Sequence, residues 1–161
     1  MPNQKLEKST FGAGCFWNVE EMFMRIDGVK STAVGFMGGG VPNPTYENVC
    51  GGNTGHAEVV YMEYDPTKVS YDNLLKVFWE NHDPTTMNRQ GPDVGEQYRS
   101  VIFYYTDEQK KLAEESKEKL EKSGNFADPI VTQIVPAEEF YKAEEYHQKY
   151  IEKQELADSH T

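Results

Sequence analysis

Residues 10–21 read TFGAGCFWNVEE, and this stretch organises the rest of the chain. Gly12 and Gly14 allow a tight backbone turn and leave room for a ligand beside it. Apolar side chains then recur at helical spacing, at Phe16, Val19, Phe23 and Ile26. Cys15 therefore falls at the start of a predicted helix, where free backbone N–H groups and the helix dipole favour a thiolate. The alternative is a buried, inert structural cysteine.

The length and composition indicate one folded domain. A chain of 161 residues suits a single core, and we expect one domain over residues 1–161 with 1–4 and about 152–161 flexible. The net charge of −11 comes without a basic patch, which argues against a nucleic-acid partner. No apolar signal region or membrane-length run is present. Because two cysteines make no disulfide framework, we expect reduced thiols and a cytoplasmic location.

The order of predicted elements indicates an α+β fold. Predicted strands cover 5–12, 29–37, 57–64, 98–105 and 130–135. Predicted helices run from 15 to about 27, from Ser70 to the Asp83-Pro84 stop, from a capping box at 106–109 to Gly124, and from Pro136 through Phe140, Tyr141 and Tyr146. The first six elements match the βαββαβ pattern of a ferredoxin-like core, an antiparallel sheet with helices on one face, followed by C-terminal additions.

Two stretches rich in Gly, Pro and Asn, 38–55 and 85–97, are predicted to be irregular. Long loops in a compact domain are usually functional. Potentially reactive side chains gather in or beside them: Tyr46, Cys50, His56, Glu58, His82, Asp83, Asp93 and Tyr98. We therefore expect a site where these loops meet the Cys15 turn.

Several of these residues have a structural alternative. Glu58 opens an apolar strand, where burial would raise its pKa and make it a general acid, although position alone favours a strand-edge carboxylate paired with lysine. Tyr46 and Tyr98 could donate to a developing oxyanion, but most of the ten tyrosines must simply pack. His56 could be a base for Cys15, while a hydrogen-bonded structural histidine is the simpler interpretation.

The sequence predicts no bound metal or cofactor. Cys50 and His56 are six residues apart and have no companion Cys-x-x-Cys or histidine pair, so the spacing fits no structural zinc pattern. Residues 38–40 are three glycines after a strand, but no helix opens there, so the context of a dinucleotide fingerprint is missing.

Four blocks of sequence resemble the A-type peptide methionine sulfoxide reductases. They are GCFW at 14–17, PTYENVCGGNTGHAE at 44–58, VFWENHDP at 77–84 and RQGPDVGEQYRS at 89–100, and the resemblance runs from about residue 8 to 150. It implies a two-layer α/β sandwich of ferredoxin-like type and thiol-dependent reduction of methionine-S-sulfoxide, free or in proteins. This enzyme class repairs oxidised methionine.

The resemblance also implies the role of each site residue. Cys15 would attack the sulfoxide sulfur and become a sulfenic acid, and Glu58 would protonate the departing oxygen. Tyr46 and Tyr98 would hydrogen-bond that oxygen, and Asp93 would support the polar side of the site. The walls of an apolar pocket for the S-methyl group would be Phe16 and Trp17.

The family's tail cysteine, which resolves the sulfenic acid in many members, is missing from residues 150–161. We therefore expect an external thiol to reduce Cys15, from thioredoxin, from glutaredoxin with glutathione, or from dithiothreitol in vitro. Cys50 is the less favoured resolving residue. Two other hypotheses remain, a thiol peroxidase or hydrolase that uses Cys15 with His56, and a non-enzymatic acidic binding module with an inert Cys15.

Overall fold

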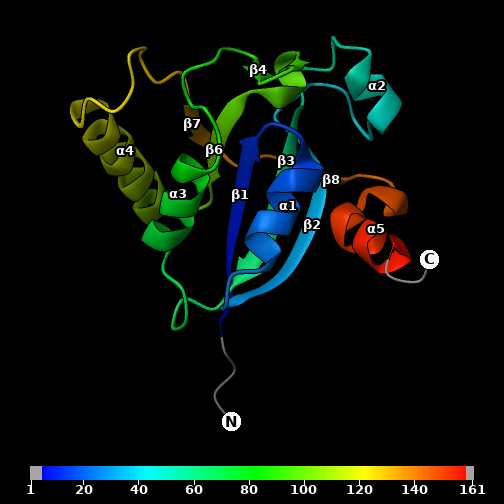
Figure 1. Ribbon diagram of the computed structural model, residues 1–161, viewed down its shortest axis with the longest axis horizontal. Coiled ribbons are helices and arrows are strands. Elements are labelled where there is room, and N and C mark those ends of the chain that lie inside the picture. Colours follow the sequence, from blue (N-terminus) through cyan, green and yellow to red (C-terminus); the bar gives the residue numbers. More distant parts are fainter. Residues whose placement is uncertain (1–4, 159–161) are drawn as a thin grey trace.

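The computed structural model describes residues 5–158 and is built on a six-stranded sheet (Figure 1). The strands lie in the order β7 (Gln133–Pro136), β6 (Ser100–Tyr104), β1 (Glu7–Ala13), β3 (Ala57–Tyr64), β2 (Val29–Met37) and β8 (Tyr141–Lys142). All neighbours pair antiparallel except β6 and β7, which are parallel. The predicted mixture of helices with a mostly antiparallel sheet is confirmed.

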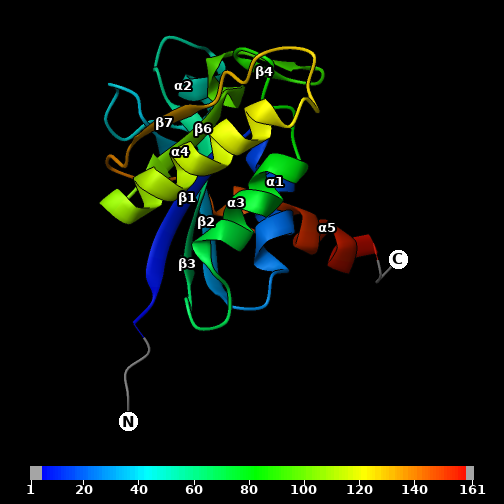
Figure 2. The same cartoon turned by 90° about the vertical axis from the view of Figure 1, so that its left-hand side faces the viewer.

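The main core lies between the sheet and the helices α1 (Phe16–Met24), α3 (Tyr71–Glu80) and α4 (Asp107–Lys122), which cover one face (Figure 2). Phe11 of β1 stacks on Phe23 of α1 at 5.3 Å and on Phe78 of α3 at 5.0 Å between ring centroids. A smaller cluster covers the other face around Val59 and Phe103. Strands β1 and β3 therefore bury side chains on both faces, which fixes their register.

The predicted bounds of β2 and β3 are confirmed residue for residue, and Ser70 caps α3 by accepting the backbone N–H of Asn73 at 3.1 Å. Thr106 likewise caps α4 through the N–H of Gln109 at 3.0 Å. Caps and alternating strands are local signals, and here the local signals agree with the fold.

The two stretches predicted to be irregular contain short regular elements. Helix α2 (Tyr46–Cys50) begins with a capping box between Thr45 and Asn48, and it lies inside a stretch whose Gly, Pro and Asn content predicted no helix. Between 85 and 97, β4 (Arg89–Gln90) and β5 (Asp93–Val94) form a small hairpin, followed by the 3₁₀ turn η1 (Glu96–Tyr98). The strand predicted from 98 accordingly begins at Ser100.

The helix predicted from Pro136 is wrong. That segment instead runs along the outer edge of β2 as β8, because Phe140 stacks on Tyr61 at 5.3 Å and Tyr141 pairs with Phe36. A 3₁₀ turn η2 (Glu145–His147) and helix α5 (Tyr150–Asp158) follow. Residues 152–158 of the predicted flexible tail are thus helical, while 1–4 and 159–161 lie outside the described residues. Among residues 5–158, no helix is long and apolar enough to cross a membrane.

Candidate active site

Cys15 is the residue at which β1 turns into α1. It is the N-cap of the helix, and its carbonyl accepts the N–H of Val19 at 3.4 Å, while its side chain caps nothing. Gly14 before it has a φ of +97°, and a Cβ there would lie 2.7 Å from the side chain of Gln90. Glycine therefore permits both the turn and the close approach of the β4–β5 hairpin to Cys15.

The thiolate predicted for Cys15 is wrong for the free protein. Burial raises the pKa of this half-buried thiol to about 11, and the negative charges of Glu58 and Asp93 act in the same direction. The backbone N–H groups of Trp17 and Asn18 favour the thiolate, as the helix-start argument requires, but loss of hydration outweighs them. At neutral pH the resting group is a thiol.

Glu58 is a buried acid beside the start of α1. Its side chain is 1% exposed, and its Oε1 accepts the backbone N–H of Phe16 at 3.2 Å. Its Oε2 is also buried and has no hydrogen-bond partner among the described residues. Burial raises the pKa of Glu58 to about 8, the Phe16 N–H opposes the shift, and the charge of Asp93 adds to it. The expectation of burial is confirmed, and none of the ion pairs among residues 5–158 involves Glu58.

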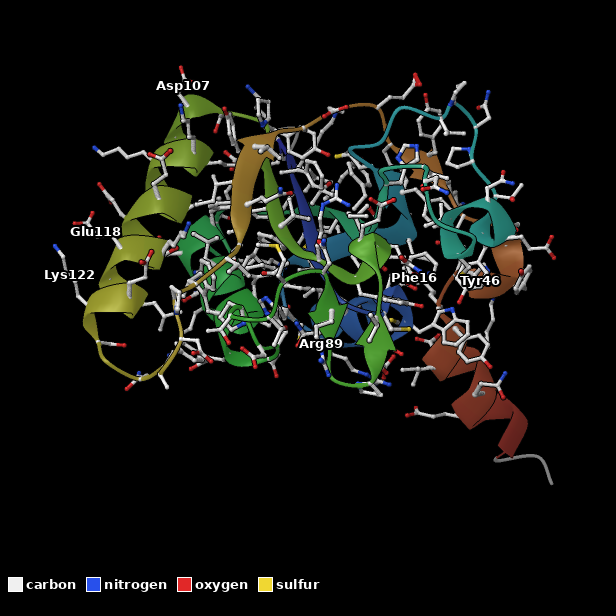
Figure 3. All side chains as sticks on the ribbon, turned by 90° about the horizontal axis from the view of Figure 1, so that it is seen from above. Phe16, Tyr46, Arg89, Asp107, Glu118 and Lys122 are labelled. Carbon is white, nitrogen blue, oxygen red and sulfur yellow. The ribbon has the colours of Figure 1, made fainter. Side chains whose placement is uncertain are left out.

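Tyr46 and Tyr98 bring two phenols to the same region. Tyr46 begins α2, its ring lies 6.0 Å from that of Phe16, and Figure 3 shows the two side by side at the end of the molecule near α2 and α5. Burial raises the pKa of Tyr98 to about 12 and raises that of Tyr46 further, and the charge of Glu58 acts on both. Both phenols therefore keep their protons and remain hydrogen-bond donors at neutral pH.

Asp93 reaches the site from the β4–β5 hairpin. It lines, with Cys15, a groove of about 430 Å³ whose walls include Asn18, His82 and Gln90. Its negative charge contributes to the raised pKa values of Cys15, Glu58 and Tyr98. The hairpin thus brings a carboxylate to the polar side of Cys15.

Trp17 lies two residues after Cys15 in the first turn of α1, and its side chain packs among aromatic rings. Its indole lies over the ring of Tyr150 at 3.9 Å with only 12° between the planes, and 6.4 Å from the ring of Tyr46. The indole Nε1–H donates to His147 Nδ1 at 2.9 Å. Three aromatic neighbours from two distant parts of the chain, Tyr46 and the pair His147 and Tyr150, therefore fix one side chain.

His147 and Tyr150 contact the predicted site residue Trp17, and the sequence did not single them out. His147 is 1% exposed, and its ring centroid lies 4.3 Å from that of Tyr46. Because Nδ1 accepts the hydrogen bond from the Trp17 indole N–H, the proton of the neutral ring is on Nε2. This Nε2 is buried and has no hydrogen-bond partner in residues 5–158. Burial also lowers the pKa of His147, so the ring is neutral. The only sequence signal was the aromatic content of a polar segment predicted as helix and tail.

The histidines suspected of catalysis or bordering the second loop are structural. His56 accepts the Gly39 N–H at Nδ1 (3.0 Å) and bonds the Val41 carbonyl through Nε2 at 2.7 Å, which confirms the structural interpretation. His82 bonds the Phe78 carbonyl at 2.6 Å and the Ser100 hydroxyl at 2.7 Å. Burial lowers the pKa of His82 to about 4. Neither ring has a free nitrogen with which to deprotonate Cys15.

Cys50 is exposed and is the last residue of α2. Its thiol hydrogen-bonds the Tyr46 hydroxyl, and burial of the sulfur raises the pKa of Cys50 despite this bond. Its charge also acts on Tyr98, as that of Cys15 does. Both cysteines are free thiols.

The comparisons with known proteins identify the family of the chain. The family model for peptide methionine sulfoxide reductase matches residues 7–161. The peptide methionine sulfoxide reductase MsrA of Methanothermobacter thermautotrophicus is 66% identical over 92% of this chain and 88% of its own length. Reduced Mxr1 from Saccharomyces cerevisiae superposes with a TM-score of 0.85 at 39% identity, over 96% of this chain and 88% of that one.

A second structure of Mxr1 is a complex with Trx2, and it matches with a TM-score of 0.61 at 28% identity, over 92% of this chain and 87% of that one. Identity above 60% across most of both chains exceeds what a shared fold alone explains. The chain therefore belongs to the A-type peptide methionine sulfoxide reductase family, and it is an oxidoreductase that acts on methionine sulfoxide.

Proposed function

We propose that the chain reduces the S epimer of methionine sulfoxide, free and in proteins, with Cys15 as nucleophile and Glu58 as proton donor. The proposal rests on the state of Glu58. Its Oε2 is buried and has no hydrogen-bond partner among the described residues, and the pKa of its carboxyl group is about 8. A sulfoxide is a poor electrophile until its oxygen is protonated or strongly hydrogen-bonded. A carboxylic acid with a free O–H meets that requirement at neutral pH.

The reaction balances within these two groups. Glu58 gives its proton to the sulfoxide oxygen, the Cys15 sulfur attacks the substrate sulfur, and the thiol proton passes to Glu58. The attack forms a bond between the Cys15 sulfur and the substrate sulfur. The oxygen then leaves the substrate sulfur and bonds to the Cys15 sulfur while the S–S bond breaks. The sulfoxide is reduced to methionine by two electrons, and Cys15 is oxidised by two electrons to a sulfenic acid. Positive charge that develops on the polarised substrate sulfur favours the thiolate. Cys15 is therefore activated by bound substrate and not in the free enzyme.

The remaining residues fit supporting roles. Tyr46 and Tyr98 stay protonated and donate to the sulfoxide oxygen. Phe16 and Trp17 form the apolar pocket for the S-methyl group, and Asp93 supports the polar side. These roles are supported by the proximity of the side chains to one another. The charge of Glu58 acts on both phenols, and the Phe16 ring lies 6.0 Å from that of Tyr46.

Thioredoxin is the reductant that we favour, because the relative Mxr1 has been crystallised with Trx2. Glutaredoxin with glutathione is the alternative, and dithiothreitol should suffice in vitro; no bound cofactor is needed. A cytoplasmic location would supply either system. We propose that the external thiol acts on Cys15 directly, with Cys50 as the less favoured resolving residue although Gly51 and Gly52 give its segment freedom.

We propose one catalytic domain over residues 1–161, because the described residues 5–158 are built on a single six-stranded sheet. The elements β1, α1, β2, β3, α3 and β6 occur in βαββαβ order, and the strands lie as β6-β1-β3-β2. We propose that these six elements are a ferredoxin-like core, to which β7, β8, α4 and α5 are added.

The function is tested with the two enantiomers of methyl p-tolyl sulfoxide and dithiothreitol. We expect the S enantiomer to be consumed with formation of the sulfide and the R enantiomer to remain. Absence of reaction with the S enantiomer overturns the proposal. Equal consumption of both would contradict the stereochemical part alone.

A further inference from the structure

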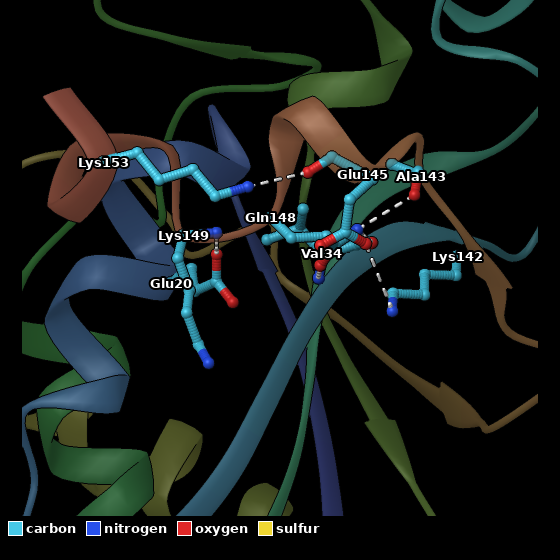
Figure 4. A network of polar contacts seen from close by, with 8 residues as sticks. All are labelled: Glu20, Val34, Lys142, Ala143, Glu145, Gln148, Lys149 and Lys153. Carbon is cyan, nitrogen blue, oxygen red and sulfur yellow. Dashed lines mark hydrogen bonds and ion pairs between the residues drawn. The ribbon is translucent and has the colours of Figure 1, made fainter.

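We propose that Glu20 and Gln148 are positioning residues for the substrate pocket, because they hold residues 143–150 in the place where His147 and Tyr150 fix Trp17. The inference rests on the proposed role of Trp17 as a pocket wall. Neither residue contributes to the groove beside Cys15. Both act through polar contacts to the backbone, drawn in Figure 4.

Gln148 continues the pairing along β2 where β8 has ended. Strand β8 pairs with Gly35 and Phe36 only. At the next position, Val34 donates its N–H to Gln148 Oε1 at 2.8 Å, and its carbonyl accepts Gln148 Nε2 at 2.9 Å. Nε2 also donates to the Ala143 carbonyl at 3.0 Å. The Ala143 N–H also donates to the Val34 carbonyl at 3.0 Å. The side-chain amide thus completes the pairing of Val34 and ties the turn after β8 to the sheet (Figure 4).

Glu20, on α1, accepts a hydrogen bond from the backbone of Lys149, the residue after Gln148. Its carboxylate is 1% exposed and accepts the Thr32 hydroxyl at 2.7 Å and the Lys149 backbone N–H at 2.6 Å. Lys149 has a φ of +54°, which lies in the left-handed region that L side chains rarely adopt. Surrounding contacts must hold such a residue in place. The Glu20 bond anchors the backbone where the chain turns from η2 into α5.

The two aromatic residues that fix Trp17 flank the two anchored positions, 148 and 149. His147 precedes Gln148 and accepts the indole N–H, and Tyr150 follows Lys149 and stacks on the indole at 3.9 Å. Because the anchors are one residue from each contact, their loss frees both contacts together. Trp17 lies three residues before Glu20 on the same helix, so α1 supplies both the wall and the anchor of its cover.

The test compares Glu20→Ala with Glu20→Gln and with Gln148→Met. Ala removes both acceptors. Gln keeps an oxygen for the Lys149 N–H and can donate to the Thr32 hydroxyl. Met keeps the length of Gln148 without its hydrogen bonds. Lys142→Ala is the matched control, since it removes an exposed ion pair with Glu145 from the same segment.

Two measurements separate positioning from general destabilisation. The first is acrylamide quenching of Trp17 fluorescence in a Trp79→Phe background, because the chain has only two tryptophans. The second is the split between KM and kcat for the S sulfoxide. We expect Glu20→Ala and Gln148→Met to quench more readily and to lose about tenfold in kcat/KM, mainly through KM, as for a weakened apolar pocket. Glu20→Gln and Lys142→Ala should resemble the parent protein.

Lys149→Gly gives a further check, because glycine keeps the N–H and accepts the positive φ. It should leave quenching unchanged. The inference is overturned if Glu20→Ala and Gln148→Met fold cooperatively and leave Trp17 quenching as it was. Unfolding of Glu20→Ala at assay temperature leaves Gln148→Met to decide. Since quenching needs no turnover, failure of the proposed reaction would not be mistaken for failure of this inference.

Discussion

The turn from β1 into α1 and the C-terminal segment 137–158 build opposite sides of one site in different ways. Cys15 and Glu58 lie on elements whose own sequences specify them, and the backbone of α1 joins them through the Phe16 N–H. His147 and Tyr150 come from a segment without strong local preference, and the hydrogen bond from Trp17 to His147 spans 130 residues of sequence. The placement of Cys15 and Glu58 therefore follows from local structure, whereas the placement of His147 and Tyr150 depends on long-range contacts.

Replacing Cys15 by Ser should give the largest effect and abolish turnover. A hydroxyl group is a far weaker nucleophile near neutral pH, and it lacks the redox chemistry of sulfur. Sulfide formation from the S sulfoxide, followed by chromatography, is the measurement, with Cys50→Ser as the matched cysteine control. More than a trace of activity in Cys15→Ser would show that the reactive group lies elsewhere.

Glu58→Gln keeps the shape of the side chain and removes its proton. We expect the reduction step to slow by about 10²–10⁴-fold, the usual contribution of a general acid. In the wild type, kcat/KM should fall as pH rises through about 8, because the acid form of Glu58 is lost above its pKa. The mutant should lack this decline. A rate within a few-fold of wild type would reduce Glu58 to a structural role.

The same carboxyl group should make wild-type stability depend on pH. Its pKa is about 8 in the folded protein against an ordinary 4.5, so the folded state holds the proton more tightly. The contribution of Glu58 to the free energy of unfolding is therefore fully present below about pH 4.5 and is lost as the pH rises to about 8. Relative to Glu58→Gln, the wild type should lose about 4 kcal/mol between pH 5 and pH 8.5. Urea unfolding of both proteins at the two pH values measures this, and parallel curves would contradict a buried acid.

Trp17→Ala should give the smallest effect, on selectivity and not on chemistry. A pocket wall contributes about 1–3 kcal/mol of discrimination per methylene-sized group. The ratio of kcat/KM for methyl over ethyl sulfoxides should therefore fall, while the rate of Cys15 alkylation by iodoacetamide changes little. Tyr150→Phe keeps the stacked ring and serves as the control. An unchanged ratio in Trp17→Ala would place the indole outside the pocket.

The same contrast explains which elements could be predicted. β2, β3 and the cap of α3 carry alternation, β-branched residues or a serine cap, so neighbouring residues suffice. The burial of Glu58 followed from the apolar strand around it. Helix α2 was missed because its capping box is surrounded by Gly, Pro and Asn. The helix predicted from Pro136 was wrong because pairing with β2, through Tyr141 and Gln148, overrides helix propensity.

The ionisation of Cys15 shows a second limit of sequence reasoning. Its position at the helix start was predicted correctly, and the N–H groups of Trp17 and Asn18 do favour the thiolate. Burial and the Glu58 charge reverse the net direction, and both depend on residues brought in by other strands. Position along the chain made Cys15 a candidate nucleophile beside its structural alternative, and it did not predict the ionisation state of the thiol.

The most direct test of Cys15 as the nucleophile is a single turnover without reductant. Reduced enzyme is mixed with one equivalent of the S sulfoxide, and sulfide, free thiols and dimedone adducts are counted. We predict one equivalent of sulfide, a dimedone adduct on Cys15 and one titratable thiol on Cys50. A Cys15–Cys50 disulfide with no adduct would make Cys50 the resolving residue. If no sulfide forms, or if sulfide forms while the Cys15 thiol remains intact, Cys15 is not the nucleophile that reduces the sulfoxide.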